Sequence, residues 1–252
     1  MARDSVLLNP VAASETRGQP ASAHVRRQRI DPHVVSLTNP ESFEASQYRR
    51  LRLAVERLRE TRGAKVLAFS SPSPGEGKTL TAVNLAATLA LAADLRVLLV
   101  DADLHRPSVP RYLGIDAQDA PGLADLVHDP QLALRDVVIR QPPLAFDVIL
   151  AGSLRTVAPY ETFRSSRLTQ LLQDARAAYD YVLVDTPPLI AVPDCQVLAP
   201  ALDGFLLVVS AHKTSRRMLG EALDERVPLK ILGLVFNNDD DCGRGYDKSY
   251  YR

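Results

Sequence analysis

Long apolar runs alternate with helical periodicities along most of the chain. Runs of consecutive apolar residues predict buried strands over residues 65–70, 96–101, 147–151, 181–185, 205–210 and 231–237. Apolar residues at helical spacing predict helices over residues 42–59, 78–92 and 161–178. Runs that are continuous rather than alternating belong to strands covered on both faces, as in parallel sheets. The pattern therefore predicts an α/β fold, a doubly wound and mostly parallel sheet with helices on both faces.

The two ends of the chain lack this pattern. Residues 1–40 are rich in Ala, Ser, Pro, Arg and Gln and show no sustained periodicity, which predicts a disordered leader. Residues 239–252 are polar, contain Gly and hold a group of tyrosines, and they predict a flexible tail. The residues between them, 41–238, form the predicted domain, whose first element is the Arg-rich helix 42–59.

Composition narrows the class of protein. Apolar residues make up 46% and charged residues 24% of the 252 residues, which is close to the average for soluble domains. The 30 basic and 30 acidic residues balance, which argues against a dedicated nucleic-acid binder. Cys195 and Cys242 lie far apart in no metal-binding spacing, which favours a reducing cytoplasm. No apolar run reaches the roughly 18 residues that span a bilayer, and the first residues lack signal-peptide features.

Phosphate-binding chemistry is concentrated between the first predicted strand of the domain and the helix that follows it. Residues 73–79 read Ser-Pro-Gly-Glu-Gly-Lys-Thr. Gly75 and Gly77 allow a tight turn that aims backbone N–H groups at phosphate oxygens, and the start of the helix adds its positive dipole end. Lys78 supplies a mobile charge for the terminal phosphates, and Thr79 supplies a hydroxyl for Mg²⁺. Pro72 stands where the P-loop motif has its first Gly, so the alternative is a Gly-rich turn without a ligand.

Two later predicted strands end in carboxylates. Asp101 and Asp103 follow one buried strand, and Asp185 ends another. In a doubly wound sheet, ligands bind beyond the carboxyl ends of the strands. A single Asp at such a position is usually a cap or turn residue, but buried strands avoid unpaired carboxylates. The three together beside a P-loop therefore indicate a site for Mg²⁺ and for an attacking hydroxyl.

With these motifs the sequence resembles the bacterial tyrosine kinases of exopolysaccharide and capsule synthesis. They belong to a P-loop group that also holds the cell-division and plasmid-partitioning ATPases. The resemblance covers about residues 42–252, and its motifs lie at residues 73–79, 101–107, 121–126, 151–153 and 184–188. Pro72 is compatible with this family, which often lacks the first Gly. Partitioning ATPases carry an additional Lys where this chain has Ser73, so the loop favours the kinase group.

The resemblance implies ATP and Mg²⁺ as cofactors and assigns roles to individual residues. Nucleotide contacts are expected from Ser73, Pro74, Gly75, Glu76, Gly77, Lys78, Thr79, Leu80 and Asn237. Thr79, Asp101 and Asp185 are the expected metal site, and Lys78, Asp101, Asp103 and Asp185 are the expected catalytic residues. Asp101 either accepts the tyrosine hydroxyl proton or shapes the metal site, Asp103 assists it, and Asp185 orients metal-bound water. Asn237 resembles an adenine contact, and the alternative is a strand-end Asn that bonds turn backbone.

The resemblance also implies contacts between subunits. The family autophosphorylates a C-terminal tyrosine cluster, here Tyr246, Tyr250 and Tyr251, and the alternative is a tail with no acceptor role. Helix 42–59 resembles an interface helix of the form E-x-x-R-x-x-R through Arg49 and Arg52. Ser46 stands at the usual Glu position and Glu44 lies five residues before Arg49. The alternatives are that Glu44 makes the contact from a shifted turn, or that this is an ordinary solvated amphipathic helix. Arg106 is either a charge stabiliser or an interface residue.

These expectations combine into one function with two rivals. The predicted function is an ATP-dependent protein-tyrosine autokinase that regulates exopolysaccharide or capsule polymerisation and export. The expected partners are a transmembrane chain-length determinant and further copies of the chain, which would place a cytoplasmic protein peripherally at the inner face of the membrane. The first rival is a nucleotide-switched assembly or positioning ATPase. The second is a regulatory subunit of an export complex that binds nucleotide without turnover.

Overall fold

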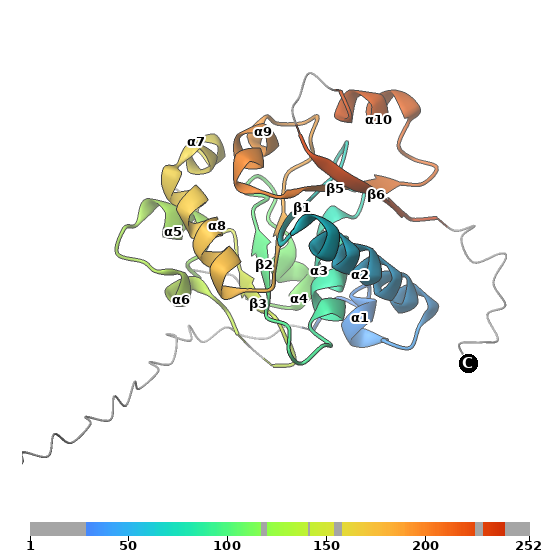
Figure 1. Ribbon diagram of the computed structural model, residues 1–252, viewed down its shortest axis with the longest axis horizontal. Coiled ribbons are helices and arrows are strands. Elements are labelled where there is room, and N and C mark those ends of the chain that lie inside the picture. Colours follow the sequence, from blue (N-terminus) through green and yellow to red (C-terminus); the bar gives the residue numbers. More distant parts are fainter. Residues whose placement is uncertain (1–28, 117–119, 141, 154–157, 225–228, 240–252) are drawn as a thin grey trace, which may run out of the picture.

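The computed structural model describes residues 29–116, 120–140, 142–153, 158–224 and 229–239, and within them it shows one six-stranded sheet (Figure 1). The strand order is β3-β2-β4-β1-β5-β6, and every neighbouring pair is parallel. The strands are β1 Val66–Ser70, β2 Val97–Asp101, β3 Asp147–Ile149, β4 Tyr181–Asp185, β5 Gly204–Ser210 and β6 Ile231–Asn237. The predicted parallel sheet is confirmed.

Helices cover both faces of this sheet, as a doubly wound fold requires (Figure 1). One face packs against α1 Val35–Thr38, α2 Phe43–Arg62, α3 Lys78–Leu89 and α4 Val109–Leu113. The other face packs against α5 Leu123–His128, α6 Leu134–Val137, α7 Pro159–Arg164, α8 Ser166–Ala178 and α9 Asp194–Leu198. A short 3₁₀ turn, Ala199–Ala201, and α10 Arg216–Ala222 complete the set.

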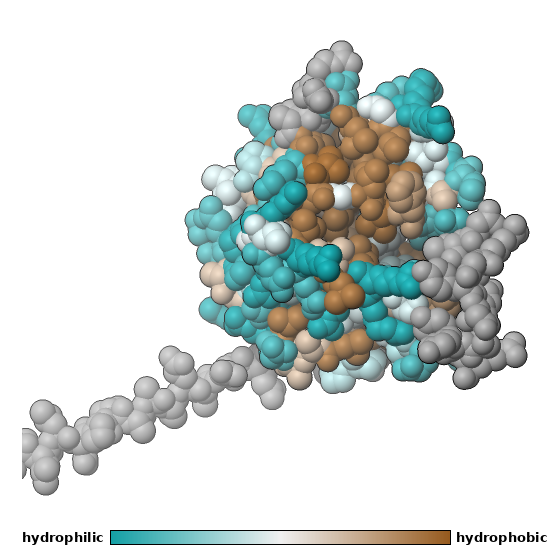
Figure 2. Space-filling view, turned by 45° about the vertical axis from the view of Figure 1, so that its right-hand side comes forward, coloured by the Kyte–Doolittle hydropathy of each residue, from teal (hydrophilic) through white to brown (hydrophobic). Residues whose placement is uncertain are grey.

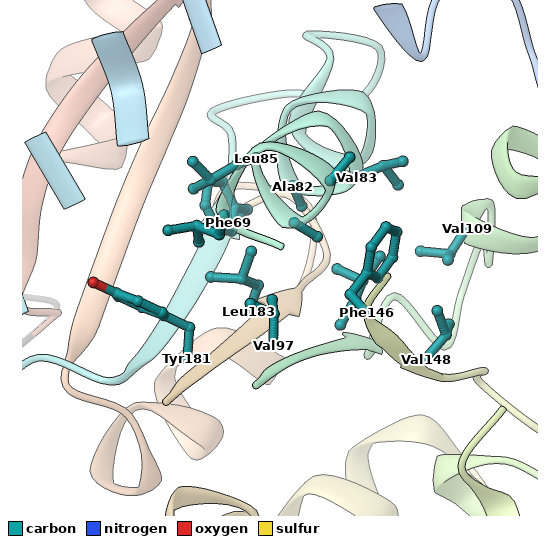
Figure 3. Packing of buried hydrophobic residues seen from close by; sticks show 14 of the residues in the cluster. Phe69, Ala82, Val83, Leu85, Val97, Val109, Phe146, Val148, Tyr181 and Leu183 are labelled. Atoms are coloured by element: carbon teal, nitrogen blue, oxygen red, sulfur yellow. The ribbon is translucent and has the colours of Figure 1, made fainter. Parts of the chain in front are cut away.

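The larger core layer lies between α3 and the central strands. Side chains alternate across a strand, so Leu67 and Phe69 of β1 enter this layer while Val66 enters the opposite one. Figure 3 shows Phe69 and Leu183 on the neighbouring strands β1 and β4, with Leu85 of α3 in the same cluster. Nearly all of α3 is buried, which explains why its sequence is apolar throughout rather than along one stripe.

The predicted disordered leader is wrong for residues 29–40. Val34 is fully buried, and α1 follows it directly. The backbone N–H of Ser36 donates to Asn84 Oδ1 at 2.9 Å, and Thr88 donates to the Ser36 hydroxyl at 3.0 Å. The sequence of this short segment shows no helical periodicity, and the segment is ordered by its contacts with α3. Residues 1–28 lie outside the described part of the chain.

The helix predicted over residues 161–178 is in fact two helices. Ser165 has φ −66° and ψ 128°, an extended conformation that separates α7 from α8. Its hydroxyl accepts the N–H of Arg167 at 3.3 Å and so caps the start of α8. The predicted boundaries elsewhere differ by a few residues, the helix from Lys78 for example ending at Leu89 rather than at residue 92.

The edge strand β6 leaves an apolar surface beside α2. Leu53 of α2 is 62% exposed and Phe236 of β6 is 65% exposed. Figure 2 shows apolar residues gathered on this face, over strands β5 and β6. A groove of about 430 Å³ runs here, lined by Arg50, Leu51, Leu53, Ala54, Arg57, Leu58, Leu206, Leu232, Gly233, Leu234 and Val235. We call these residues the α2–β6 groove.

Candidate active site

The loop between β1 and α3 has the backbone of a phosphate-binding turn. Gly75 and Gly77 have φ values of +79° and +92°, which non-glycine residues rarely adopt. A Cβ atom at Gly77 would lie 2.0 Å from Nδ2 of Asn237, so the position also excludes side chains sterically. Helix α3 starts at Lys78 without a side-chain cap, which leaves its first N–H groups available to an anion.

Lys78 and Thr79 meet the carboxylates that end the neighbouring strands. Lys78 Nζ donates to Asp103 Oδ2 at 2.7 Å and to Asp185 Oδ1 at 3.3 Å. Thr79 Oγ1 donates to the other oxygen of Asp185 at 2.6 Å. Burial alone would lower the pKa of Lys78, but the charges of Asp185 and Asp103 outweigh it and the pKa lies above its ordinary value. The ammonium group is therefore fixed in its charged form at the end of the P-loop.

Asp101 and Asp103 occupy different environments although they are two residues apart. Asp101 is fully buried, and its carboxylate accepts the backbone N–H groups of Asp103 at 3.3 Å and Val109 at 3.1 Å. Burial and the nearby Asp185 charge raise the pKa of Asp101 to about 8. Asp103 is also buried, with 4% of its surface exposed, but it lines a cavity in front of the P-loop. Asp101 therefore shapes the loop after β2, and Asp103 presents its carboxylate to the cavity.

The buried side chain of Glu76 holds the P-loop in place through hydrogen bonds. Its side chain is fully buried, and Oε1 accepts the N–H and the hydroxyl of Ser73 at 3.0 and 2.6 Å. Oε2 accepts the N–H of Ser210 at 3.1 Å and the hydroxyl of Thr214 at 2.7 Å. The carboxylate thus ties the loop to the end of β5, and it points away from the place where a nucleotide phosphate would lie.

Asn237, at the end of β6, also holds the P-loop in place. Its Nδ2 donates to the carbonyl oxygen of Glu76 at 2.9 Å. This bond is the one expected of a strand-end Asn that serves turn backbone, the alternative to an adenine contact. Both Glu76 and Asn237 therefore act on the shape of the P-loop in this structure.

The cavity in front of the P-loop measures about 540 Å³. Its lining comes from the P-loop, the segment after β2 and the segment after β4: Pro74, Gly75, Gly77, Lys78, Thr79, Leu80, Asp103, His105, Arg106, Pro107, Ser108, Arg111, Tyr112, Pro187, Pro188, Ala191 and Val192. An ammonium group, backbone N–H groups at a helix start, a hydroxyl and carboxylates are together the donor set that suits a nucleotide phosphate with a hard cation. Across the described ranges, no cluster of three or more His, Cys, Asp or Glu side chains is arranged to hold a metal ion.

Ser108 and His105 line the cavity but were not singled out by the sequence analysis. The hydroxyl of Ser108 lies 3.2 Å from that of Thr79. His105 Nε2 lies 2.6 Å from Oδ2 of the buried Asp194, so this pair joins the segment after β2 to the start of α9. His105 follows directly on the acidic motif, but its pairing with Asp194 depends on a crossover that no local pattern shows.

The predicted interface residues are partly engaged within the chain. Arg49 donates to the carbonyl of Pro40. Arg52 donates to Glu56 at 2.7 Å and to the carbonyl of Thr88 at 3.0 Å, which fastens α2 to α3. Arg106 is exposed at the cavity wall. The predicted acceptors Tyr246, Tyr250 and Tyr251 lie outside the described residues.

Comparison with known proteins identifies the family to which the chain is similar. The model of an AAA domain matches residues 64–221. The chain is 33% identical to the tyrosine-protein kinase YwqD of Bacillus subtilis over 214 residues, which is 84% of this chain and 88% of YwqD. It is 32% identical to the succinoglycan biosynthesis transport protein ExoP of Rhizobium meliloti, covering 84% of this chain but only 27% of ExoP.

A solved structure agrees with the sequence comparison. The kinase domain of the Escherichia coli tyrosine kinase ETK superposes with a TM-score of 0.78 at 27% identity, covering 88% of this chain and 86% of that domain. Within the described residues, no helix is both long and apolar enough to cross a bilayer. The fold, the P-loop with its acidic strand ends and these likenesses together show that the chain belongs to the bacterial tyrosine-protein kinases with a P-loop nucleotide-binding domain.

Proposed function

We propose that this chain is a protein-tyrosine autokinase that transfers the γ-phosphoryl group of ATP to tyrosines of its own C-terminal tail, Tyr246, Tyr250 and Tyr251. The observation that carries the proposal is the cluster of Lys78, Thr79, Asp103 and Asp185 at one end of an open cavity. ATP with Mg²⁺ supplies the phosphoryl group and part of the charge neutralisation when it is bound here. Thr79 and Asp185 would hold the cation, with Asp101 behind them.

Lys78 is the residue best placed to stabilise developing phosphate charge. Two carboxylates hold its ammonium group at the cavity floor, so its position is set before any ligand arrives. The N–H groups at the start of α3 face the same place. Preorganised donors of this kind act without reorganisation during the reaction, and removal of one typically costs about 10²–10³-fold in rate.

Asp103 is the better candidate for the group that receives the phenol proton. Asp103, although only 4% exposed, lines the cavity, whereas Asp101 does not line it and accepts two backbone N–H groups. A phenol has a pKa near 10, so the proton needs an acceptor only late in the transfer. We therefore assign proton acceptance to Oδ2 of Asp103, and we assign to Asp101 the positioning of the segment that carries Asp103.

The test is mass spectrometry of the C-terminal peptide after incubation with Mg-ATP. Wild type should gain phosphate on the tail tyrosines, and Lys78→Ala should reduce the initial rate by at least about 10²-fold. Lys230→Ala, which removes an exposed Lys away from the cavity, is the matched control and should keep the wild-type rate. Equal labelling in wild type and Lys78→Ala would exclude the assigned role of Lys78.

The rival nucleotide-switched ATPase makes a different prediction for the tail. If the output were a conformational state, replacement of Tyr246, Tyr250 and Tyr251 by Phe would leave ATP turnover and assembly unchanged, and no phosphotyrosine would form. A regulatory subunit would bind nucleotide without either product. The kinase proposal requires phosphotyrosine in wild type and its loss in the triple Phe variant.

We further propose that the kinase serves exopolysaccharide or capsule export together with a transmembrane chain-length determinant, at the inner face of the membrane. The likeness to ExoP, a succinoglycan biosynthesis transport protein, supports the pathway. The apolar α2–β6 groove supports assembly, because exposed apolar surface of this kind marks interaction sites. Cell fractionation with and without the partner tests the location: the chain should sediment with membranes only when the partner is present.

A further inference from the structure

The cavity in front of the P-loop has two walls of different chemistry. Pro187, Pro188, Ala191 and Val192, after β4, form an apolar wall. The segment after β2 contributes a wall with the cations Arg106 and Arg111, and Lys78 and Asp103 line the same cavity. An apolar wall suits the ring of a tyrosine, whereas a pair of guanidinium groups suits anions around it.

The guanidinium groups of Arg106 and Arg111 are not paired with the carboxylates beside the P-loop. Asp103 and Asp185 already pair with Lys78, and within the described part of the chain neither carboxylate forms an ion pair with Arg106 or Arg111. The backbone N–H of Arg106 donates to Asp103 Oδ1 at 3.1 Å, which fixes its position beside the floor. The guanidinium of Arg111 lies 4.8 Å from the ring centre of Tyr112, and its charge is the last of several influences that lower the pKa of Asp31, after the hydrogen bonds of Asp31 to His33.

One tyrosine of the C-terminal sequence has acidic neighbours that complement this wall. Asp239, Asp240 and Asp241 precede Tyr246 and Asp247 follows it directly, with Arg244 two residues before it. The charged residues beside Tyr250 and Tyr251 are instead Lys248 and Arg252. We propose that Arg106 and Arg111 select acceptor tyrosines whose neighbours are acidic side chains. The proposal rests on the proposed kinase function and adds the substrate class: an acidic tyrosine peptide, from another copy of this chain or from a different protein.

Phosphate is the other anion that the same two guanidinium groups could bind, either on ATP or on a phosphorylated tail. Lys78, Thr79 and the start of α3 already face the place of the nucleotide phosphates. Arg106 and Arg111 belong to the segment after β2, and the backbone N–H of Arg106 donates to Asp103, the residue to which we assign acceptance of the phenol proton. The geometry therefore favours carboxylates of the acceptor, and the measurements below separate the two sources.

The experiment uses two synthetic peptides with the sequence of residues 239–252, one natural and one with its four Asp residues changed to Asn. Binding to the full chain is measured by fluorescence polarisation, and phosphate transfer is followed by mass spectrometry of the added peptide. Wild type should bind and phosphorylate the acidic peptide about five- to tenfold better, because each exposed charge pair contributes only modestly. The preference should shrink as salt is raised.

Variants of Arg106 and Arg111 test whether these two residues cause the preference for the acidic peptide. Arg106→Gln with Arg111→Gln should bring the ratio between the two peptides close to one and leave the KM for ATP within about twofold. Arg135→Gln, an exposed Arg on α6, is the control and should keep the wild-type ratio. Arg106→Glu with Arg111→Glu should reverse the preference.

The other possible results contradict either the recognition of acidic peptides or the proposed kinase function. Equal binding of both peptides by wild type, or an unchanged ratio in the double Gln variant, overturns the proposal. A KM for ATP raised tenfold or more, or tighter binding of a phosphotyrosine peptide alone, shows phosphate recognition and also overturns it. Charge-selective binding without phosphate transfer would reject the proposed kinase function and leave the recognition of acidic tyrosine peptides standing.

Discussion

The two carboxylates of the Asp-Ala-Asp motif show how strongly a single residue depends on its environment. Asp101 is surrounded by protein, so burial and Asp185 disfavour its charge and its pKa lies well above that of an exposed Asp. The unfolded chain loses this proton near pH 4, whereas the folded chain keeps it until about pH 8. Because the folded state binds more protons in this window, the contribution of Asp101 to stability falls as pH rises through it.

Asp101→Asn should therefore stabilise the nucleotide-free protein at high pH while it abolishes kinase activity. We expect a gain of about 1–3 kcal/mol in the free energy of unfolding at pH 8, shrinking towards zero near pH 4. Urea unfolding at a series of pH values measures it, and the tail-labelling assay measures activity. A variant that is less stable than wild type at pH 8, or whose difference does not change with pH, would contradict the assignment.

Helix α1 depends on its tertiary contacts in the same way, because it has only four residues and no apolar stripe of its own. Its order comes from Asn84 of α3, whose Oδ1 accepts the Ser36 N–H and whose Nδ2 donates to the carbonyls of His33 at 3.1 Å and Leu80 at 3.0 Å. The side chain is fully buried, so its loss leaves backbone groups without a partner.

Asn84→Ala should lower the free energy of unfolding by about 1–3 kcal/mol, the usual cost of an unsatisfied buried polar group. It should also raise amide exchange in residues 33–38 more than in the strands. Gln173→Ala, which removes an exposed amide from α8, is the matched control and should change stability by no more than about 0.5 kcal/mol. Uniform exchange along the chain would show that Asn84 supports the whole fold rather than α1.

At the scale of the whole molecule, the α2–β6 groove is an apolar surface on the side of the sheet away from β3. An edge strand left open beside exposed Leu53 and Phe236 is a surface that soluble proteins normally cover. The cavity and the groove lie at separate parts of the molecule, so contacts between copies at the groove can leave the cavity open to a tail.

Leu53→Glu with Phe236→Glu should therefore dissociate the assembly that we expect of wild type, because each change places a charge in an apolar contact. The molar mass from light scattering, with and without Mg-ATP, is the measurement. Leu91→Glu is the matched control, since Leu91 is also 62% exposed but lies in the turn that follows α3 and does not line the groove. A wild type that stays monomeric at all concentrations, or equal dissociation by the control, would argue against the groove as the interface.

The sequence alone determined the features that depend on neighbours along the chain. Continuous apolar runs predicted the parallel sheet, because strands buried on both faces must be apolar throughout. The P-loop and the three Asp positions were predictable because their chemistry needs fixed residue types at the carboxyl ends of strands. Comparison with known proteins confirmed the family that these motifs indicated.

The tertiary structure decided what distant segments do to one another. The surroundings of each carboxylate depend on which loops pack around it, so the sequence did not show that Asp103 lines the cavity whereas Asp101 does not. Glu76 and Asn237 brace the P-loop through β5 and β6, about 130 to 160 residues further along the chain. Residues 29–40 are ordered by α3 rather than by their own periodicity. Such contacts arise from packing between elements, and a pattern read along one segment contains no information about its partner.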